Sequence, residues 1–278
     1  MFKIIEKKML NPTICSLVVE APRIAAAALP GQFLMVRADE PGERIPLTIS
    51  DYDPVKGTVT IVIQPIGAST RHMVDDFAEG DGFADVAGPL GNPSDFVKMS
   101  PEELANERVV FIAGGLGTAP VYPQAKWLHE HGVKVDVIIG ARTKELLIYE
   151  DKFKSVTDHL YMCTDDGSYG FKGVGTARLE ALVADGETYT RAVAIGPMIM
   201  MKFATLTCKK LGIPIQVSMN TLMVDGTGMC GACRVSVGGV TKFACVDGPE
   251  FDGYLVDFDE AMRRSAQYKA EEGLANGK

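Results

Sequence analysis

Three cysteines in a glycine-rich stretch near the C-terminus constrain this chain more than any other feature. Asp225, Cys230, Cys233 and Cys245 follow the pattern D-x4-C-x2-C-x11-C. With cysteine in place of the aspartate, this is the plant-type spacing that binds a [2Fe–2S] cluster. Three thiolates and one carboxylate can complete the tetrahedra of two irons, and the intervening glycines let backbone N–H groups turn toward the cluster sulfides. The stretch therefore predicts a [2Fe–2S] site on these four residues.

Two other interpretations of this stretch remain open on the residues alone. Zinc also accepts cysteine and aspartate ligands, although a zinc-binding C-x2-C is normally paired with a second half-site. Asp225 precedes a glycine, so it could stabilise a turn without touching a metal. The other cysteines, Cys15, Cys163 and Cys208, are scattered, and we expect them to be buried thiols in a reducing compartment.

Length, charge and hydropathy exclude several classes of protein. The chain has 278 residues, and a length of about 150 residues per domain suggests two domains. Its net charge of −8 argues against a nucleic-acid-binding surface. No apolar run reaches the roughly 18 residues that a membrane-spanning helix needs, and the first ten residues do not form a signal peptide. We therefore expect a soluble, cytoplasmic protein.

The pattern of apolar runs divides the chain into four parts. Residues 1–97 hold short Val-, Ile- and Phe-rich segments between Pro, Gly and Asp clusters, which predicts an antiparallel β barrel. In residues 98–218 apolar strands alternate with helical stretches, which predicts a Rossmann-like α/β unit with a parallel sheet. Residues 219–256 form a loop-rich unit around the cysteines, and residues 257–278 form a charged, helix-prone tail whose end we expect to fray. The expected strands are 13–19, 32–37, 58–64, 82–87, 108–113, 133–140, 160–163, 192–195 and 214–218, and the expected helices are 121–131, 176–184 and 198–211.

Two glycine turns in the second part could bind a dinucleotide. Residues 114–120, Gly-Gly-Leu-Gly-Thr-Ala-Pro, join an expected strand to an expected helix, where exposed backbone and a helix N-terminus could hold a pyrophosphate. Residues 196–200, Gly-Pro-Met-Ile-Met, follow another strand, and ligands of open parallel sheets bind beyond the strand C-termini. The first turn lacks the G-x-G-x-x-G fingerprint, so a plain strand-to-helix turn stays an alternative.

Further polar segments are candidates for cofactor contacts. Arg44, in a segment that we expect to end a strand, could clamp a phosphate, and residues 67–70 open a short helix whose N–H groups could meet the same phosphates. An exposed arginine and an ordinary helix cap explain these residues equally well. Residues 164–170 could meet a nicotinamide ribose or form a solvated turn. Arg142 and Lys144 could hold a 2′-phosphate or be solvated, so the residues do not decide between NAD and NADP.

The order of these motifs resembles the ferredoxin–NADP reductase superfamily. R-x-P-x-T at 44–48, G-x-S-T at 67–70, G-P-L-G at 88–91, G-G-x-G-x-A-P, G-P-x-x-M and the cysteine loop follow one another over residues 1–250. Within the superfamily the chain looks like the branch that contains the electron-transfer subunit of dihydroorotate dehydrogenase B. It looks closer still to the small (alpha) subunits of the NADH-dependent reduced ferredoxin:NADP oxidoreductase, an electron-bifurcating transhydrogenase, because Asp225 stands where the dihydroorotate subunit would have cysteine.

The resemblance implies three cofactor sites. FAD would be held by the barrel, with Arg44 on the pyrophosphate, although the superfamily's flavin-stacking tyrosine is replaced by Pro46 and Leu47 stands where a hydroxyl residue would be. The dihydroorotate branch shares that proline. The implied FAD residues are Arg44, Pro46, Leu47, Thr48, Ile63, Gln64, Pro65, Gly67, Ser69 and Thr70; the implied NAD(H) residues are Gly115, Gly117, Thr118, Pro120, Asp166, Gly196, Pro197 and Met200; the implied cluster ligands are Asp225, Cys230, Cys233 and Cys245.

The implied function is electron transfer without a catalytic acid or base. NADH donates a hydride, whereas an iron–sulfur cluster accepts single electrons, and a flavin reconciles the two. The transhydrogenase family pairs this subunit, as a heterodimer, with a larger subunit that carries FAD and [4Fe–4S] clusters and binds NADP(H), so that ferredoxin takes part indirectly. Three alternatives stay open: an electron-transfer subunit of dihydroorotate dehydrogenase B, a self-sufficient NAD(P)H:ferredoxin reductase, and a zinc-stapled, non-catalytic binding module.

Overall fold

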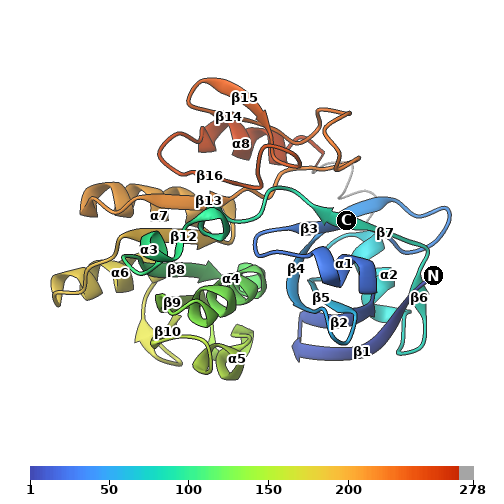
Figure 1. Ribbon diagram of the computed structural model, residues 1–278, viewed down its shortest axis with the longest axis horizontal. Coiled ribbons are helices and arrows are strands. Elements are labelled where there is room, and N and C mark those ends of the chain that lie inside the picture. The colour runs from blue at the N-terminus through green and yellow to red at the C-terminus, as the bar shows by residue number, and fades with distance from the viewer. Residues whose placement is uncertain (269–278) are drawn as a thin grey trace.

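An antiparallel sheet curved into a nearly closed barrel forms the first unit of the computed structural model, which describes residues 1–268 (Figure 1). Its strand order is β6-β1-β2-β5-β4-β3-β7, and every neighbouring pair is antiparallel. The elements are β1 (Phe2–Asn11), β2 (Ile14–Glu20), α1 (Pro22–Ala27), β3 (Phe33–Arg37), β4 (Arg44–Asp53), β5 (Thr58–Ile63), α2 (Ala68–Asp75), β6 (Gly82–Phe83) and β7 (Asp85–Leu90).

Apolar side chains fill this barrel as the sequence predicts. Ile4, Leu17, Val36 and Ile61 are fully buried in one cluster, and β-branched residues favour strands because they pack well on a pleated surface. The predicted antiparallel barrel is confirmed.

Two local predictions in the barrel are wrong. The expected strand 82–87 is two strands, because β6 pairs with β1 at one edge of the sheet while β7 pairs with β3 at the other edge. Arg44 does not lie at the end of a strand: it begins β4, which pairs with β3 from Arg44 onward and with β5 as far as Asp53. Both differences depend on which strands meet in the folded barrel, which local composition does not reveal.

A mainly parallel sheet with helices on both faces forms the second unit. The strand order is β11-β10-β9-β8-β12-β13-β16, and only the last strand, β16, runs antiparallel to its neighbour. The elements are η1 (Asp95–Lys98), α3 (Pro101–Leu104), β8 (Arg108–Gly114), η2 (Gly115–Gly117), α4 (Thr118–Glu130), β9 (Lys134–Ala141), η3 (Lys144–Leu146), α5 (Glu150–Lys154), β10 (His159–Thr164), β11 (Phe171–Lys172), α6 (Gly175–Ala184), β12 (Arg191–Ile195), α7 (Met198–Leu211), β13 (Ile215–Ser218) and β16 (Glu250–Asp252).

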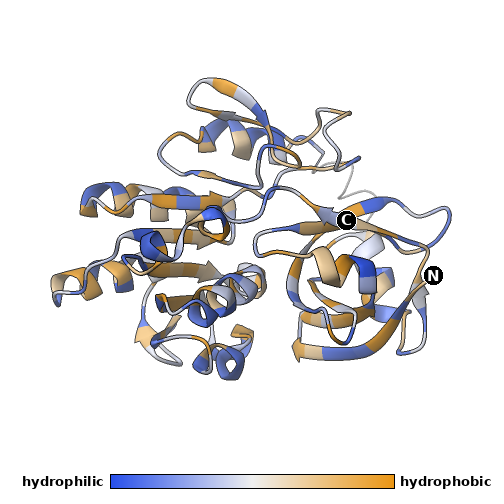
Figure 2. Cartoon of the chain, viewed as in Figure 1, coloured by the Kyte–Doolittle hydropathy of each residue, from blue (hydrophilic) through white to orange (hydrophobic). Residues whose placement is uncertain are grey.

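Both faces of this sheet are apolar, which explains its continuous hydrophobic strands. Val109 and Phe111 of β8 pack in one cluster with residues of α4 and α5, while Val110 and Ile112 pack in another with residues of α6 and α7. Figure 2 shows the hydrophobic colour concentrated on the central strands and mixed with hydrophilic residues on the surrounding helices. The helix expected to begin at Val121 begins at Thr118, because a proline is tolerated in the first turn of a helix.

The order of the strands creates a switch point between β8 and β12. From β8 the chain moves outward to β9 and β10, and it then returns to add β12 and β13 on the other side of β8. The helices that follow β8 and β12 therefore lie on opposite faces of the sheet, and the turns that lead into them lie side by side at its C-terminal edge, where open α/β sheets bind ligands. These two turns are the glycine turns singled out in the sequence.

The C-terminal unit packs on both of the others. It contains the hairpin β14 (Arg234–Val237) and β15 (Val240–Phe243), the strand β16, and α8 (Phe258–Ser265), and it lies above the sheet in Figure 1. Its Cys233 belongs to the same hydrophobic cluster as Met35 of the barrel and Ala204 of α7. The expected helical tail begins with α8, and the expected fraying end lies outside the described residues. Within residues 1–268 no helix has the length and apolar character that crossing a membrane requires.

One carboxylate of the barrel forms ion pairs with two lysines of the parallel-sheet unit. Asp51 of β4 pairs with the ammonium groups of Lys126 on α4 and Lys152 on α5, both at 3.2 Å. The Lys152 ammonium also lies 4.6 Å from the ring centroid of Tyr122 and 4.7 Å from that of Tyr149. These contacts link the two units in addition to their apolar packing.

We expect Asp51→Asn to lower the free energy of unfolding by about 1 kcal/mol, because two partly exposed lysines lose their shared counter-charge. Asp53→Asn is the matched control, because Asp53 lies on the same strand but pairs with an exposed residue of the same unit, Lys56. Urea unfolding at low salt measures both variants. Equal stabilities for the two variants would contradict this role of Asp51.

Candidate functional site

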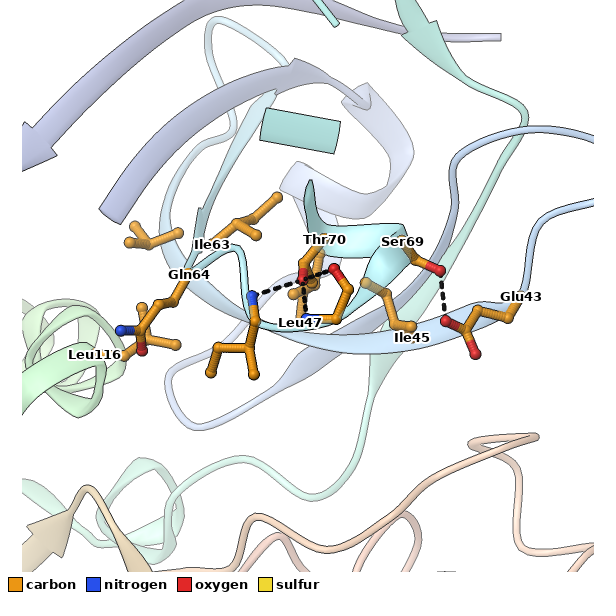
Figure 3. A pocket seen from close by; sticks show the side chains of 11 residues that line it. Glu43, Ile45, Leu47, Ile63, Gln64, Ser69, Thr70 and Leu116 are labelled. Carbon is orange, nitrogen blue, oxygen red and sulfur yellow. Dashed lines mark hydrogen bonds between the residues drawn. The ribbon is translucent and has the colours of Figure 1, made fainter. Parts of the chain in front are cut away.

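A cavity of about 230 Å³ opens where the barrel faces the second unit (Figure 3). Its wall is mostly apolar, and the start of α2 forms one side. The cavity is smaller than the roughly 300–1,000 Å³ of a typical ligand pocket, so it would enclose part of a flavin nucleotide and leave the rest on the surface. The lining residues are Glu43, Ile45, Leu47, Val62, Ile63, Gln64, Ile66, Gly67, Ser69, Thr70 and Leu116.

The structure brings six of the ten expected FAD residues to this cavity. These are Leu47, Ile63, Gln64, Gly67, Ser69 and Thr70, whereas Arg44, Pro46, Thr48 and Pro65 do not line it. Successive residues of a strand point to opposite faces, so Ile45 and Leu47 share one face of β4 while Arg44, Pro46 and Thr48 share the other. Sequence reasoning missed five of the lining residues, which are Glu43, Ile45, Val62, Ile66 and Leu116. The alternation along β4 could have found Ile45, whereas only the packing of the two units brings Leu116 here.

The start of α2 uses its side chains for folding and leaves its backbone for a ligand. The Thr70 hydroxyl accepts hydrogen bonds from the backbone N–H groups of Ile66 (3.1 Å) and Gly67 (3.0 Å). The Ser69 hydroxyl donates to the carboxylate of Glu43. The first N–H groups of a helix have no partner within the helix, so they can meet a phosphate. The cap and the phosphate-binding interpretations of this segment are thus compatible.

The two glycine turns of the parallel-sheet unit pack directly against each other. A Cβ on Gly114 would collide with the sulfur of Met200, and a Cβ on Gly117 would collide with the carbonyl oxygen of Ile195. Gly115, by contrast, has a φ of +55° and open space around it. The glycines therefore serve two needs: close approach of the turns, and backbone exposed to the crevice.

Two helices begin at this crevice without side-chain caps. Gly117 precedes α4 and Pro197 precedes α7, and neither residue offers a side-chain hydrogen bond to the helix. The Thr118 hydroxyl is buried and has no hydrogen-bond partner among the described residues. A pair of uncapped helix N-termini beside flexible glycine backbone suits a pyrophosphate.

The loop that carries Asp166 is built around that carboxylate. Asp166 accepts hydrogen bonds from the hydroxyl (2.7 Å) and backbone N–H (2.9 Å) of Ser168, and these bonds lower the pKa of Asp166. The Ser168 hydroxyl in turn accepts from the N–H of Lys144, whose ammonium lies 5.0 Å from the ring centroid of Tyr169. The ammonium group of Lys144 therefore contacts the ring of Tyr169, and the exposed, ionised carboxylate of Asp166 lies in the same loop.

Two of the four expected cluster ligands are in direct contact, and the other two lie in the same loop. The sulfurs of Cys233 and Cys245 lie 3.2 Å apart, and the backbone N–H groups of Ala232, then Asp225, lower the pKa of the Cys230 thiol. Burial and the thiol of Cys233 raise the pKa of Cys245. Within the described chain, no three His, Cys, Asp or Glu side chains surround one point as a single ion requires. Three thiols and one carboxylate in one loop fit a cluster with two irons, each taking two protein donors.

Asp225 both stabilises a turn and keeps one oxygen available. Its Oδ2 accepts from the N–H (2.9 Å) and hydroxyl (2.5 Å) of Thr227, and these bonds lower the pKa of Asp225. No hydrogen bond to its Oδ1 is found within residues 1–268. The turn-forming and metal-binding interpretations of Asp225 are therefore compatible.

The cluster loop lies against the barrel. Gly226, at a φ of +83°, approaches Met35 of β3 so closely that a Cβ would lie 2.6 Å from the Met35 Cγ. The guanidinium of Arg44, which pairs with Asp85 at 2.5 Å, also helps to lower the pKa of Asp225. Arg44 thus lies at the contact between the barrel and the cluster loop.

Comparisons with known proteins agree with this arrangement. The family model of the iron–sulfur cluster binding domain of dihydroorotate dehydrogenase B matches residues 220–257. A protein of Thermotoga maritima, named as a homolog of the dihydroorotate dehydrogenase B (NAD(+)) electron transfer subunit, is 45% identical and aligned over 98% of this chain and 93% of its own. A Clostridium beijerinckii protein, known only as an uncharacterized protein in the adh 3′ region, is 59% identical over 99% of this chain and 93% of its own.

A solved structure matches the whole chain. It comes from work on flavin-based electron bifurcation by the NADH-dependent reduced ferredoxin–NADP oxidoreductase, with a TM-score of 0.91 and 43% identity over 100% of this chain and 97% of that one. The resemblance inferred from the motif order is confirmed. The match of the cysteine loop to an iron–sulfur domain also removes the basis for the zinc interpretation. This chain belongs to the family of dihydroorotate dehydrogenase B-type electron transfer subunits, with the ferredoxin-reductase-like fold and an iron–sulfur cluster binding domain.

Proposed function

We propose that this chain is the small subunit of an electron-bifurcating, NADH-dependent reduced ferredoxin:NADP oxidoreductase. The observation that carries the proposal is the meeting of the three candidate sites. Leu116 of the dinucleotide turn lines the flavin cavity. Gly226 of the cluster loop packs on Met35, which pairs with Pro46 on the strand that carries the cavity-lining Ile45 and Leu47. Electrons can therefore pass between NADH, FAD and a [2Fe–2S] cluster within this one chain.

Each unit of the chain has a binding task in this proposal. Residues 1–97 hold FAD, residues 98–218 hold NAD(H), and residues 219–256 hold the cluster through Asp225, Cys230, Cys233 and Cys245. FAD supplies the step from hydride to single electrons. The chain's residues position these groups: the apolar wall of the cavity excludes water, and the uncapped starts of α2, α4 and α7 face phosphates. The residues assigned to FAD and NAD(H) from the resemblance remain the proposed contacts.

Asp225 favours this function over the runner-up. An electron transfer subunit of dihydroorotate dehydrogenase B is the alternative, and the name of the Thermotoga relative supports it. A carboxylate with one oxygen free at the first ligand position instead favours the bifurcating enzyme, as does 43% identity over the full chain to the structure from that work.

An apolar rim around the cluster loop is the proposed contact with the larger subunit. Val224 and Met229 flank Asp225 and Cys230, Val246 follows Cys245, and Leu222 lies nearby; all four are exposed, and the side chain of Met229 is 88% exposed. Exposed apolar residues gathered at one place mark interaction surfaces. We propose that this rim binds a larger subunit with FAD and [4Fe–4S] clusters that binds NADP(H), forming a cytoplasmic heterodimer that ferredoxin meets through that subunit.

The purified chain should show the flavin and the cluster together. In an anaerobic titration, NADH should bleach the flavin absorption bands and then produce the EPR signal of one reduced [2Fe–2S] cluster. The chain alone should pass electrons from NADH to an artificial acceptor but should not reduce NADP. A colourless protein with one bound zinc, or flavin that NADH leaves oxidised, would contradict the proposal.

Gly117→Ala should impair reduction by NADH without removing the flavin. The new Cβ would collide with the carbonyl oxygen of Ile195 and push the two glycine turns apart. We expect the rate of flavin reduction at limiting NADH to fall by about tenfold or more, because small displacements of a positioned reactant are costly. Stopped-flow absorbance measures this rate. Glu130→Ala, at the exposed C-terminal end of α4, is the control, and equal rates in the two variants would contradict the site.

Asp225→Asn tests whether Asp225 is a ligand of the cluster or only stabilises the turn. Asparagine can still accept the hydrogen bonds from Thr227, but it is a neutral and weaker ligand for iron. If Asp225 is a ligand, the asparagine variant should lose the cluster or change its EPR g-values, and Asp225→Cys should change them differently. Asp247→Asn is the control, because Asp247 accepts a backbone hydrogen bond from Phe243 near Cys245. Wild-type EPR spectra for both Asp225 variants would show that Asp225 only forms the turn.

A further inference from the structure

A carboxylate, Glu250, lies where all three units of the chain meet. It begins β16, the strand through which the C-terminal unit joins the parallel sheet. Its Oε1 accepts hydrogen bonds from the side-chain amide of Gln124 on α4 (2.7 Å) and from the hydroxyl of Ser94 (3.1 Å), which lies between the barrel and the sheet. A Cβ on Gly31 of the barrel would lie 3.1 Å from the same oxygen. The proposed function gives this carboxylate no task.

The surroundings of Glu250 stabilise its negative charge poorly. Burial raises the pKa of Glu250 to about 7, and the hydrogen bonds from Ser94 and Gln124 offset this only in part. The carboxylate of Asp95 on η1 also raises the pKa, whereas the guanidinium of Arg191 on β12 lowers it. Arg191 is itself paired with Glu107 at 3.3 Å, so its charge is shared.

The remaining neighbours of Glu250 do not titrate. Helix α4 presents the amide of Gln124, the barrel presents Gly31, and β13 pairs Ser218 with Glu250. No second carboxylate, histidine or lysine of the described chain is hydrogen-bonded to Glu250. The carboxyl group of Glu250 is therefore the group that would bind or release a proton at this junction.

Glu250 lies close to the cluster loop along the chain and in space. Cys245 is five residues away, and because an extended chain spans at most about 3.6 Å per residue, the two Cα atoms are at most about 18 Å apart. Asn92 holds the intervening residues to the barrel: its side-chain amide donates to the carbonyl of Val246 at 3.0 Å, and its N–H donates to the carbonyl of Gly248 at 2.7 Å. Phe251, next to Glu250, belongs to the same buried cluster as Cys245.

We propose that Glu250 is a proton-binding site coupled to the cluster, and that it takes up part of a proton from water when the cluster gains one electron. The electron comes from NADH by the proposed route, and the proton uptake offsets part of its charge. The inference therefore rests on the proposed function for the presence of a reducible cluster. It adds that reduction of the cluster is coupled to proton binding within the chain.

The expected coupling follows from the distance. If the upper bound of about 18 Å is taken as the separation of the two charges, one negative charge raises the proton affinity of a carboxylate roughly fivefold at an effective dielectric constant of about 20. Linkage requires the same factor in the reduction equilibrium of the cluster. A fivefold factor corresponds to about 40 mV for one electron.

A redox titration of the cluster-loaded chain at a series of pH values tests this coupling. Below the pKa of Glu250 the carboxyl is protonated in both redox states, and well above it the carboxylate is ionised in both. Between these limits reduction takes up a fraction of a proton, so the midpoint potential should fall by about 40 mV in total as pH rises from about 6 to about 9. EPR of mediator-equilibrated samples reports the reduced fraction.

Glutamine is neutral at every pH, so the midpoint potential of the cluster in the Glu250→Gln variant should not show this fall. Glu187→Gln is the matched control, because Glu187 pairs with Arg108 at the opposite, N-terminal edge of the sheet and should behave as the wild type does. Ser94→Ala removes a donor to the ionised carboxylate, so it should move the fall to higher pH. The same pH dependence in Glu250→Gln and the wild type would overturn the inference.

A second measurement decides the matter if Glu250→Gln does not fold. The infrared difference between reduced and oxidised wild-type protein should contain the band of a protonated carboxyl that shifts in D₂O, and the absence of this band would overturn the inference. Both measurements reduce the cluster with dithionite and mediators. Failure of NADH to reduce the flavin would therefore contradict the proposed function alone, whereas a normally reducible cluster without a Glu250-dependent pH effect would contradict this inference alone.

Discussion

The arrangement of the candidate sites depends on the contact between the cluster loop and the barrel. Gly226 lies on Met35, and only a residue without a Cβ that tolerates a positive φ fits there. This approach brings Asp225 within the electrostatic reach of Arg44 on β4. Because the adjacent Ile45 and Leu47 line the flavin cavity, one strand connects the candidate flavin site to the candidate cluster site.

Hydrophobic packing makes this contact rigid. Phe33 and Met35 of the barrel, Ile215 of the parallel sheet and Cys245 of the cluster loop belong to one buried cluster, so the three units share a core. Electron transfer between fixed groups needs no mobile catalytic side chain, which agrees with the apolar lining of the cavity. Polar groups lie at the joints between units instead: Asp51 with its two lysines, and Glu250 with Ser94 and Gln124.

Much of the fold could be predicted because its patterns are local. The helix 198–211 is predicted at its observed bounds, since Gly212 ends it in the left-handed conformation that favours glycine. The strand 82–87 and the start of β4 at Arg44 could not be predicted, because they depend on which barrel edge each segment joins. The cysteine spacing identified the cluster loop for the same local reason: its glycines and thiols lie close together in the sequence.

By itself, the sequence determined the types of site: thiols at a cluster spacing, glycines at two turns, and a barrel followed by a parallel sheet. Only the tertiary structure decided how these sites meet. Leu116 reaches the flavin cavity from another unit, and Asp225 has one bonded and one free oxygen. Glu250 is hydrogen-bonded to two residues that each lie more than a hundred positions before it in the chain. The physical reason is that spacing and periodicity report contacts along one element, whereas burial, charge and hydrogen bonding between elements arise only when the chain packs.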